Sequence, residues 1–201
     1  MASVTLTEGS LLINDLRYDE ELRYRDVVGC PGAFIISEVA RANTSLTSLD
    51  VRYNSGIVGE AAERLATSVL ESKSMKIFGL IPMKGLRANE VTELDLRGKD
   101  LGLVEAHVIG SLVAVSTSLT VIDLRFNQLD NESATMLATI AKEKNISLCG
   151  ITPEQTTADL HGRPTNMMGS ADAILLTADL AVRASLTTVW TPAYEPSLDT
   201  P

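Results

Sequence analysis

Apolar residues follow two alternating periods along the chain. In residues 45–54, SLTSLDVRYN, Leu49 and Val51 fall on one face of an extended strand, while Asp50 falls on the other. In residues 59–72, apolar side chains recur at the three- and four-residue spacing of an amphipathic helix. The pattern therefore predicts a short strand, a turn and a helix in succession.

The same succession returns several times. The strand pattern L-x-x-L-x-L recurs after 28 residues, from Val91 to Leu119, and again after 29, from Leu119 to Leu148. Two shorter steps, residues 75–90 and 148–154, look like inserted half-units. A period in this range is typical of stacked repeats, in which each unit buries its apolar face against the next. Further helices are predicted over residues 32–42, 103–116, 131–144 and 169–184, with Asn131 and Ser170 as N-terminal caps.

The central unit, residues 118–148, resembles the leucine-rich repeat of ribonuclease-inhibitor type, whose units follow L-x-x-L-x-L-x-x-N-x-L and continue into a helix. It matches that pattern at Leu119, Ile122, Leu124, Asn127 and Leu129. The resemblance implies an α/β fold. This fold would be a leucine-rich-repeat solenoid forming a short horseshoe arc, with parallel strands on the concave face and helices on the convex face.

In that family an asparagine follows the strand, where its side-chain amide satisfies backbone groups as the chain turns. Asn54 and Asn127 occupy this position, so the resemblance implies a partial asparagine ladder. Lys99 and Arg163 replace the asparagine in two other units, and neither side chain accepts hydrogen bonds. We expect those two turns to be looser or differently built.

The pattern divides the chain into three parts. These are an N-terminal segment (1–18), a leucine-rich-repeat domain (19–190) of about five irregular repeats with two short insertions, and a tail (191–201). The tail is rich in proline and polar residues, which predicts disorder. The ragged ends leave open whether the chain is a fragment of a longer array. The sequence does not define the structure of the insertions.

Composition favours a folded protein with an aliphatic core, because 45% of the 201 residues are apolar and only 4% are aromatic. The net charge of −9 argues against binding to nucleic acid, which needs clustered Lys and Arg, and against an anionic membrane surface. No apolar run reaches the roughly 18 residues of a membrane span, and the first residues lack a secretory signal. We therefore expect a cytoplasmic protein. Cys30 and Cys149 lack the spacing of a metal site, and we expect both to be reduced.

Charged residues recur on the polar side of the predicted strands. The alternation places four carboxylates in one column: Asp50, Asp95, Asp123 and Asp159. The residues two positions later form the next column: Arg52, Arg97, Arg125 and His161. Neighbouring strands lie about 4.8 Å apart, so stacked like charges repel. We expect the two columns to offset this repulsion by lateral and diagonal pairing.

Two interpretations of these columns stay open. The first is a surface ladder whose charges satisfy one another. The second is a protein-recognition face, since aromatic residues and arginine anchor many interfaces. The second interpretation is favoured by aromatic residues on the same surface, at Tyr53, Phe126 and Trp190.

The sequence carries no recognisable catalytic constellation. His107 lies in a predicted helix, His161 lies in the basic column, and no nucleophile elbow or phosphate-binding glycine loop occurs. We therefore predict a non-enzymatic module, without cofactor or metal, that binds an unidentified protein through the concave sheet. The alternative is a structural segment of a longer repeat array without a ligand of its own. We expect a monomer in the first case and end-to-end association in the second.

Overall fold

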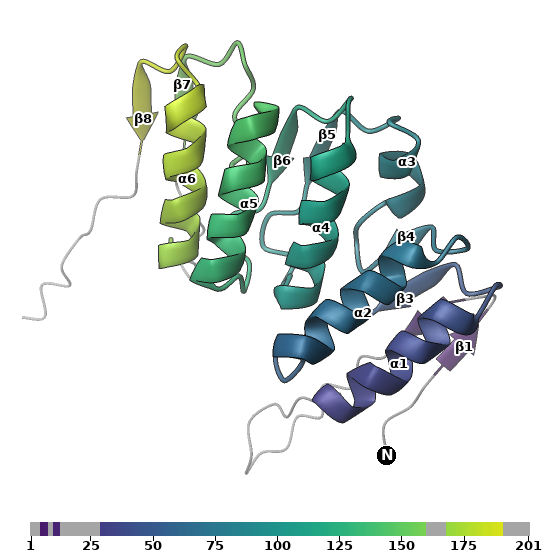
Figure 1. Ribbon diagram of the computed structural model, residues 1–201. Coiled ribbons are helices and arrows are strands. Elements are labelled where there is room, and N and C mark those ends of the chain that lie inside the picture. Colours follow the sequence, from purple (N-terminus) through teal and green to yellow (C-terminus); the bar gives the residue numbers. More distant parts are fainter. Residues whose placement is uncertain (1–4, 8–9, 13–28, 160–167, 191–201) are drawn as a thin grey trace, which may run out of the picture.

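Five long helices lie side by side in one layer, with the strands in a second layer behind them (Figure 1). This computed structural model describes residues 5–7, 10–12, 29–159 and 168–190. The helices are α1 (Cys30–Ala42), α2 (Gly59–Glu71), the short α3 (Met83–Arg87), α4 (Leu103–Val115), α5 (Asn131–Lys144) and α6 (Ser170–Val182). The strands are β1 (Thr5–Thr7), β2 (Ser10–Leu12), β3 (Ser48–Asp50), β4 (Ile77–Phe78), β5 (Glu93–Asp95), β6 (Val121–Asp123), β7 (Thr157–Asp159) and β8 (Thr188–Trp190).

The strands form three separate sheets in the described part of the chain, and not the single continuous sheet expected of a regular array. The sheets have the orders β1-β2-β3-β4, β5-β6 and β7-β8. Every pair is parallel except the antiparallel pair β1 and β2. Strand β2 pairs with β3 through Ser10 and Ser48, so part of the predicted N-terminal segment joins the sheet. The result is an α/β repeat fold with an interrupted strand layer.

Each of the two insertions supplies an extra strand position. The first contains β4 and α3, and β4 pairs with β3 through Ser48 and Ile77. Beside β6, the chain around residues 147–149 forms a further rung, in which Ile122 N–H donates to Ser147 O at 2.8 Å. Leu124 N–H likewise donates to Leu148 O at 2.9 Å. The half-units are therefore additional rungs of the stack, and they separate strands that the period alone would place side by side.

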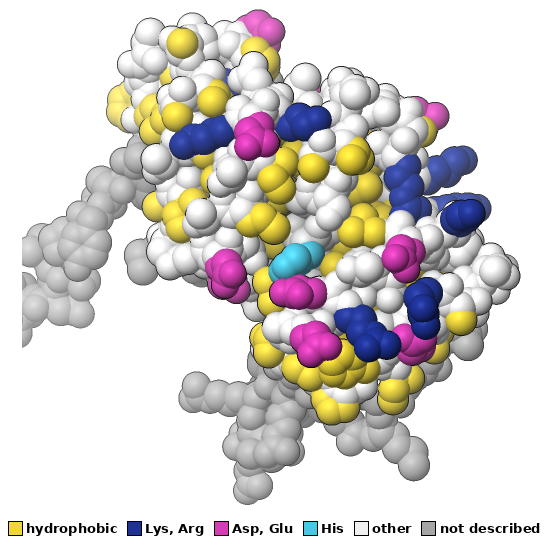
Figure 2. Space-filling view, viewed as in Figure 1, with side chains coloured by type: hydrophobic (Ala, Val, Ile, Leu, Met, Phe, Trp, Pro, Cys, Tyr) yellow, Lys and Arg dark blue, Asp and Glu magenta, His cyan; other side chains and the backbone are white. Residues whose placement is uncertain are grey.

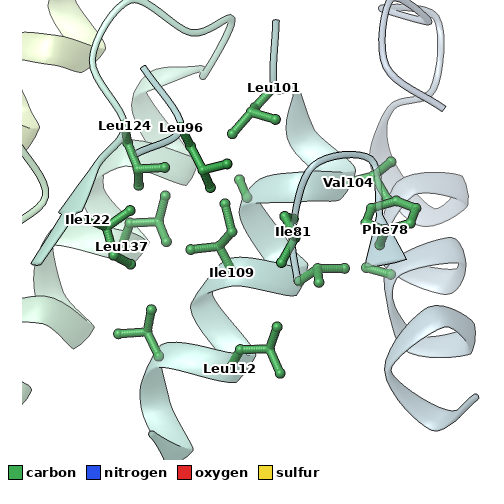
Figure 3. Close-up of a cluster of buried hydrophobic side chains, with 14 of the residues drawn as sticks. Phe78, Ile81, Leu96, Leu101, Val104, Ile109, Leu112, Ile122, Leu124 and Leu137 are labelled. Carbon is green, nitrogen blue, oxygen red and sulfur yellow. The ribbon is translucent and has the colours of Figure 1, made fainter. Parts of the chain in front are cut away.

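The core confirms the alternation predicted for the strands. Leu49 and Val51 belong to the hydrophobic cluster, and so do Ile122 and Leu124 one unit later. Figure 3 shows Leu124 pointing toward the side chains of α4. Apart from Phe78, the largest fully buried side chains are aliphatic or methionine, as the composition predicts. The same alternation puts the aspartates of the strands on the opposite side of the layer.

The predicted helix caps were wrong by one residue. The cap of α5 is Asp130, whose Oδ1 accepts the N–H of Ser133 at 2.7 Å, and the cap of α6 is Gly169. Asn131 and Ser170 instead bond to each other, because Ser170 Oγ donates to Asn131 Oδ1 at 2.7 Å. Their side chains therefore join α5 to α6 at the start of both helices.

Candidate functional site

In two units, the last aspartate of the strand pairs with the arginine two residues later. Arg52 Nε lies 3.0 Å from Asp50 Oδ1, and Arg52 Nη2 lies 2.8 Å from Asp50 Oδ2. In the unit of β6, Arg125 Nε lies 2.9 Å from Asp123 Oδ1. In both units the arginine backbone N–H also donates to the aspartate Oδ1. The expected lateral and diagonal pairing was wrong, because the chain turns after the strand and brings each arginine back onto its own aspartate.

These two ion pairs are structural. Asp50 and Arg125 are each only 6% exposed. The aspartate hydrogen bond raises the pKa of Arg52 and that of Arg125. Each guanidinium also reaches a more distant part of the chain: Arg52 Nη1 donates to Lys99 O in the turn after β5, and Arg125 Nη1 donates to Asp159 O at the end of β7, both at 3.2 Å. The pairs therefore tie successive turns together and present little free charge.

The predicted four-residue columns are not continuous. Asp95 and Asp123 are register partners in neighbouring strands, as expected. Asp50 lies in a different sheet, next to β4, and Asp159 pairs in register with Trp190. The extra rungs formed by the two insertions cause these breaks. His161 lies outside the described residues.

A smaller group on the strand side is accessible. Asp95, Arg97 and Asp159 are exposed, and so are Tyr53 at 37% and Trp190 at 59%. Register partners in a sheet project to the same face, so Trp190 lies on the side of Asp159. These five residues make up what we call the exposed strand-side group. Arg97 differs from Arg52 and Arg125, because it forms no ion pair with a carboxylate among the described residues. Its guanidinium lies 5.7 Å from the ring centre of Phe126.

Tyr53 and Phe126 occupy a backbone conformation that usually suits glycine. Their φ angles are 63° and 60°, and the equivalent residue of the third unit is Gly98, with φ 61°. Bulky residues are rare in this left-handed region, because the side chain crowds the backbone. Phe126 is held there by a hydrogen bond from its N–H to Asp172 Oδ1 at 2.9 Å. Two units thus carry an aromatic ring where glycine would be less strained.

The asparagine position works as the resemblance implied, with one difference. Asn54 Nδ2 donates to Val51 O within its own turn. Asn127 reaches back into the preceding turn, where its Oδ1 accepts the N–H groups of Lys99 and Leu101 at 3.0 and 3.1 Å. The turn that lacks its own asparagine is therefore braced by the asparagine of the next unit. The turn at Arg163 lies outside the described residues.

Sequence reasoning missed a buried brace from α6. Asp179 is fully buried, and its carboxylate accepts hydrogen bonds from Ser147 Oγ at 2.6 Å, Leu148 N at 2.7 Å and Cys149 N at 2.9 Å. One turn later, Arg183 donates from Nε to Ile151 O at 3.2 Å. The two side chains hold the rung at residues 147–149 against α6. The sequence signal for this brace is an acid and an arginine four residues apart in one predicted helix.

The cysteines are free thiols. Cys149 is buried, and burial together with the neighbouring Asp179 raises the pKa of its thiol well above the ordinary value. Cys30 is partly buried, and its Sγ lies 3.4 Å from Gly56 O. A protonated, buried thiol is a poor nucleophile, so Cys149 fits a structural position.

The described part of the chain offers neither a metal cluster nor a membrane-spanning helix. No cluster of three or more His, Cys, Asp or Glu side chains that could hold a metal ion occurs in the described ranges. Within those ranges, every helix is too short or too polar to cross a membrane. His107 lies in α4, where its Nδ1 is 2.8 Å from Leu103 O.

Glu105 is a second residue that sequence reasoning missed. It lies in the first turn of α4, is 2% exposed, and accepts the N–H of Gly102 on Oε2 at 3.0 Å. Asp172 holds the equivalent place in α6 and accepts the N–H of Gly169 at 2.9 Å. The signal for both is an acid three residues after a glycine at the start of a predicted helix.

Burial raises the pKa of the Glu105 carboxyl above its ordinary value. The folded state therefore binds this proton more tightly than the unfolded chain does. The stability that protonated Glu105 contributes is therefore fully present below the pKa of this carboxyl in the unfolded chain. It is lost as pH rises through the pKa of the same carboxyl in the folded protein. We expect Glu105→Gln to lose less stability than the wild type over this rise in pH, because Gln has no proton to release. Urea unfolding midpoints from pH 4 to pH 8 test this, and parallel profiles for the two proteins would contradict it.

Comparison with known proteins indicates which class of protein has repeats of this kind. Residues 42–66 and 115–138 match the family described as Leucine Rich repeat. These segments contain β3 with the start of α2, and β6 with the start of α5. They cover less than half of the chain, and they are two of the units with the strand-turn-helix succession. The comparison therefore supports a leucine-rich-repeat protein.

Among the solved structures that match, one is described here, and it aligns over most of the chain. It is the tropomodulin C-terminal domain of Caenorhabditis elegans, with 16% sequence identity over 81% of this chain and 84% of that chain. Its TM-score is 0.33, which is too low to support a conclusion about fold or function. Among curated proteins, no significant sequence match was found.

Proposed function

We propose that this chain is a non-enzymatic interaction module that binds a partner protein through its strand side, which corresponds to the concave face of a ribonuclease-inhibitor-type solenoid. Leucine-rich-repeat domains generally mediate protein–protein interaction, and two segments of this chain match that family. The observation that carries the proposal is the exposed strand-side group, above all Tyr53, which is exposed although it sits at positive φ.

The group has the chemistry of an interface. Aromatic and arginine side chains supply much of the binding energy of known interfaces, because each buries a large area. Tyr53, Arg97 and Trp190 are of this kind, and Asp95 and Asp159 add charge that orients a partner. A bulky ring at a strained position costs stability that a glycine would avoid. The ring of Tyr53 contacts the guanidinium of Arg52, 5.6 Å from its centre, and its remaining exposed face is open to a partner.

The buried pairs have a different role in this proposal. Asp50 with Arg52 and Asp123 with Arg125 fix the turns from which the exposed side chains project. Reversing the charge of either arginine would leave a buried carboxylate beside another and would unfold the turn. A test of binding must therefore use the exposed group alone.

We expect the variant Tyr53→Gly/Arg97→Gln/Trp190→Ala to remain folded and to lose at least tenfold in affinity for any partner captured by the wild type. Glycine relieves the strain at position 53 while removing the ring. A matched control on the helix side, Ile35→Ala/Val115→Ala/Lys142→Gln, also removes two exposed apolar side chains and one charge. Figure 2 shows charged side chains dispersed among apolar ones on that side. Affinity capture followed by calorimetry with the captured protein compares the three chains, and an equal loss in both variants would contradict the proposal.

The alternative is a segment of a longer repeat array, and the exposed strand β8 favours it. Val189 and Trp190 are exposed there, and β8 pairs with β7 alone among the described strands. An open strand edge of this kind is a template for another strand. Sedimentation over a range of concentrations separates the two functions, since stacking of chains predicts association and the module predicts a monomer.

A further inference from the structure

A groove of about 580 Å³ lies between α3 and the turns that precede β3 and β4. Its lining contains no acidic residue and four basic ones: Lys73, Lys76, Lys84 and Arg87. We call it the basic groove. At the right edge of Figure 2, Lys and Arg side chains lie together beside α3. The net charge of the chain is −9, yet three of its six lysines gather at this one place.

The insertion at residues 75–90 builds most of the basic groove, because it supplies Lys76, Lys84 and Arg87. Lys84 N–H donates to Lys76 O at 3.1 Å, which holds the start of α3 against the turn before β4. Lys76 N–H donates to Thr47 O at 2.8 Å, which joins that turn to the turn before β3. These backbone hydrogen bonds bring basic side chains from separate segments around one opening.

Arg87 has a structural role at the edge of the groove. Its Nη2 donates to Leu70 O at 2.7 Å and its Nη1 donates to Ser72 O at 3.0 Å, at the C-terminal end of α2. Basic side chains commonly bind the last carbonyls of a helix in this way. Burial lowers the pKa of the Arg87 guanidinium, whereas a carboxylate partner raises that of Arg52. The charge available to a ligand therefore belongs to the three lysines.

The three lysines of the groove are not neutralised by neighbouring acids. All three are exposed, and none forms an ion pair with a carboxylate in the part of the chain that the structure describes. The arginines on the surface of α1 and α2 differ, because Arg41 and Arg64 both pair with Glu38. Glu71, two residues before Lys73, lines a separate groove between α1 and α2. The basic groove is therefore a local site of positive potential that attracts an anionic ligand.

The backbone around the groove argues against a site for a single phosphate. Phosphate sites use backbone N–H groups that converge on the ion. Here the N–H groups of Ser45 and Leu46 both donate to Asn43 Oδ1 at 2.8 Å. Those of Lys76 and Lys84 donate to backbone carbonyls. The groove thus offers separate ammonium groups on flexible stems, which suit carboxylates that follow one another along an extended peptide.

We propose that the basic groove binds an acidic segment of a partner protein, whose Asp and Glu side chains pair with Lys73, Lys76 and Lys84. A nucleic acid fits less well, because its backbone would continue past the groove onto a chain of net charge −9. The inference goes beyond the proposed function and does not depend on it, since no member of the exposed strand-side group lines the basic groove.

The test measures the fluorescence anisotropy of a labelled peptide of alternating Glu and Asp as the full chain is added. We expect saturable binding that weakens as salt is added, because exposed charges are screened. The groove variant, Lys73→Gln/Lys76→Gln/Lys84→Gln, is expected to bind at least tenfold more weakly. Its unfolding temperature should be no lower than that of the wild type, because the substitutions remove like charges from one place. A lower unfolding temperature would mean that the lysines serve folding and would count against the inference.

A matched control separates the groove from net charge. Lys99→Gln/Lys142→Gln/Lys144→Gln replaces the other three lysines, which are also exposed, and changes the net charge by the same amount. This control is expected to bind like the wild type, and a peptide of Gln and Asn should not bind. An absence of saturable binding to the acidic peptide, or equal weakening in the two lysine variants, would overturn the inference. Displacement of the peptide by an equimolar amount of inorganic phosphate would also overturn it, because it would indicate a site for a single anion.

Discussion

Asp179→Ala is expected to lower the free energy of unfolding by about 3 kcal/mol or more, the largest effect that we expect from a single polar substitution in this chain. The carboxylate accepts three hydrogen bonds in a fully buried position. Alanine would leave the N–H of Leu148 without an acceptor and the N–H of Cys149 with only its longer contact to Ser147 Oγ, at 3.3 Å. Arg183, the residue that caps the C-terminus of the same helix, would lose a compensating charge. Urea unfolding followed by circular dichroism measures the change.

The matched substitutions separate the brace from a general effect on α6. Asp179→Asn keeps an acceptor oxygen in place and is expected to cost less than Asp179→Ala. Leu180→Ala alters the next residue, which is 44% exposed, and should change stability by less than about 1 kcal/mol. If Asp179→Ala proved no worse than Leu180→Ala, the brace would contribute nothing to the fold.

Asn127→Ala is expected to cost about 2–4 kcal/mol, because one side chain supports two turns. Its Nδ2 donates to Leu96 O and Leu124 O, each at 2.8 Å, and its Oδ1 accepts from Lys99 N and Leu101 N. Hydrogen exchange should show the loss in both turns, including the turn at Lys99 that lies 28 residues away.

Two comparisons make this prediction specific. Asn127→Asp keeps the acceptor but removes the two donors, so we expect an intermediate loss. Gln128→Ala removes an exposed side chain with one long contact to Asp100, at 3.3 Å, and should cost little. Faster exchange confined to the turn of Asn127 would contradict a brace between units.

Local pattern predicted the elements of this fold well. The period of two placed Leu49 and Val51 in the core and Asp50 on the opposite side, and the core cluster confirms it. The period of 3.6 located the long helices to within two residues of their ends, as in α5 at Asn131–Lys144. These features depend on neighbours in sequence, and a single segment carries the information.

The stacking of the units was harder to predict. The period of about 28 residues suggested that the Asp and Arg columns run unbroken, but β4 and the rung at residues 147–149 interrupt them. A rung is defined by backbone hydrogen bonds to another part of the chain, and a segment as short as Ile77–Phe78 has no period of its own. The same limit hid Asp179, which looks like any polar helix residue until the rung it caps is known.

The candidate site shows the same division. The sequence predicted a recognition surface that carries Tyr53, Arg97 and Trp190, which stays a prediction, and it treated the three arginines as equivalent. The structure separates them: Arg52 and Arg125 are paired with aspartates, whereas Arg97 is exposed over Phe126. The difference arises from burial, which a single strand pattern does not encode.

The central claim is that a partner protein binds the strand side and not the helix side. Hydrogen exchange of the full chain with and without the captured partner tests this most directly. The account predicts slower exchange around Tyr53, at residues 93–98 and in β8, with unchanged exchange along α1, α2 and α5. Protection confined to these helices, with the strand side unchanged, would contradict the account.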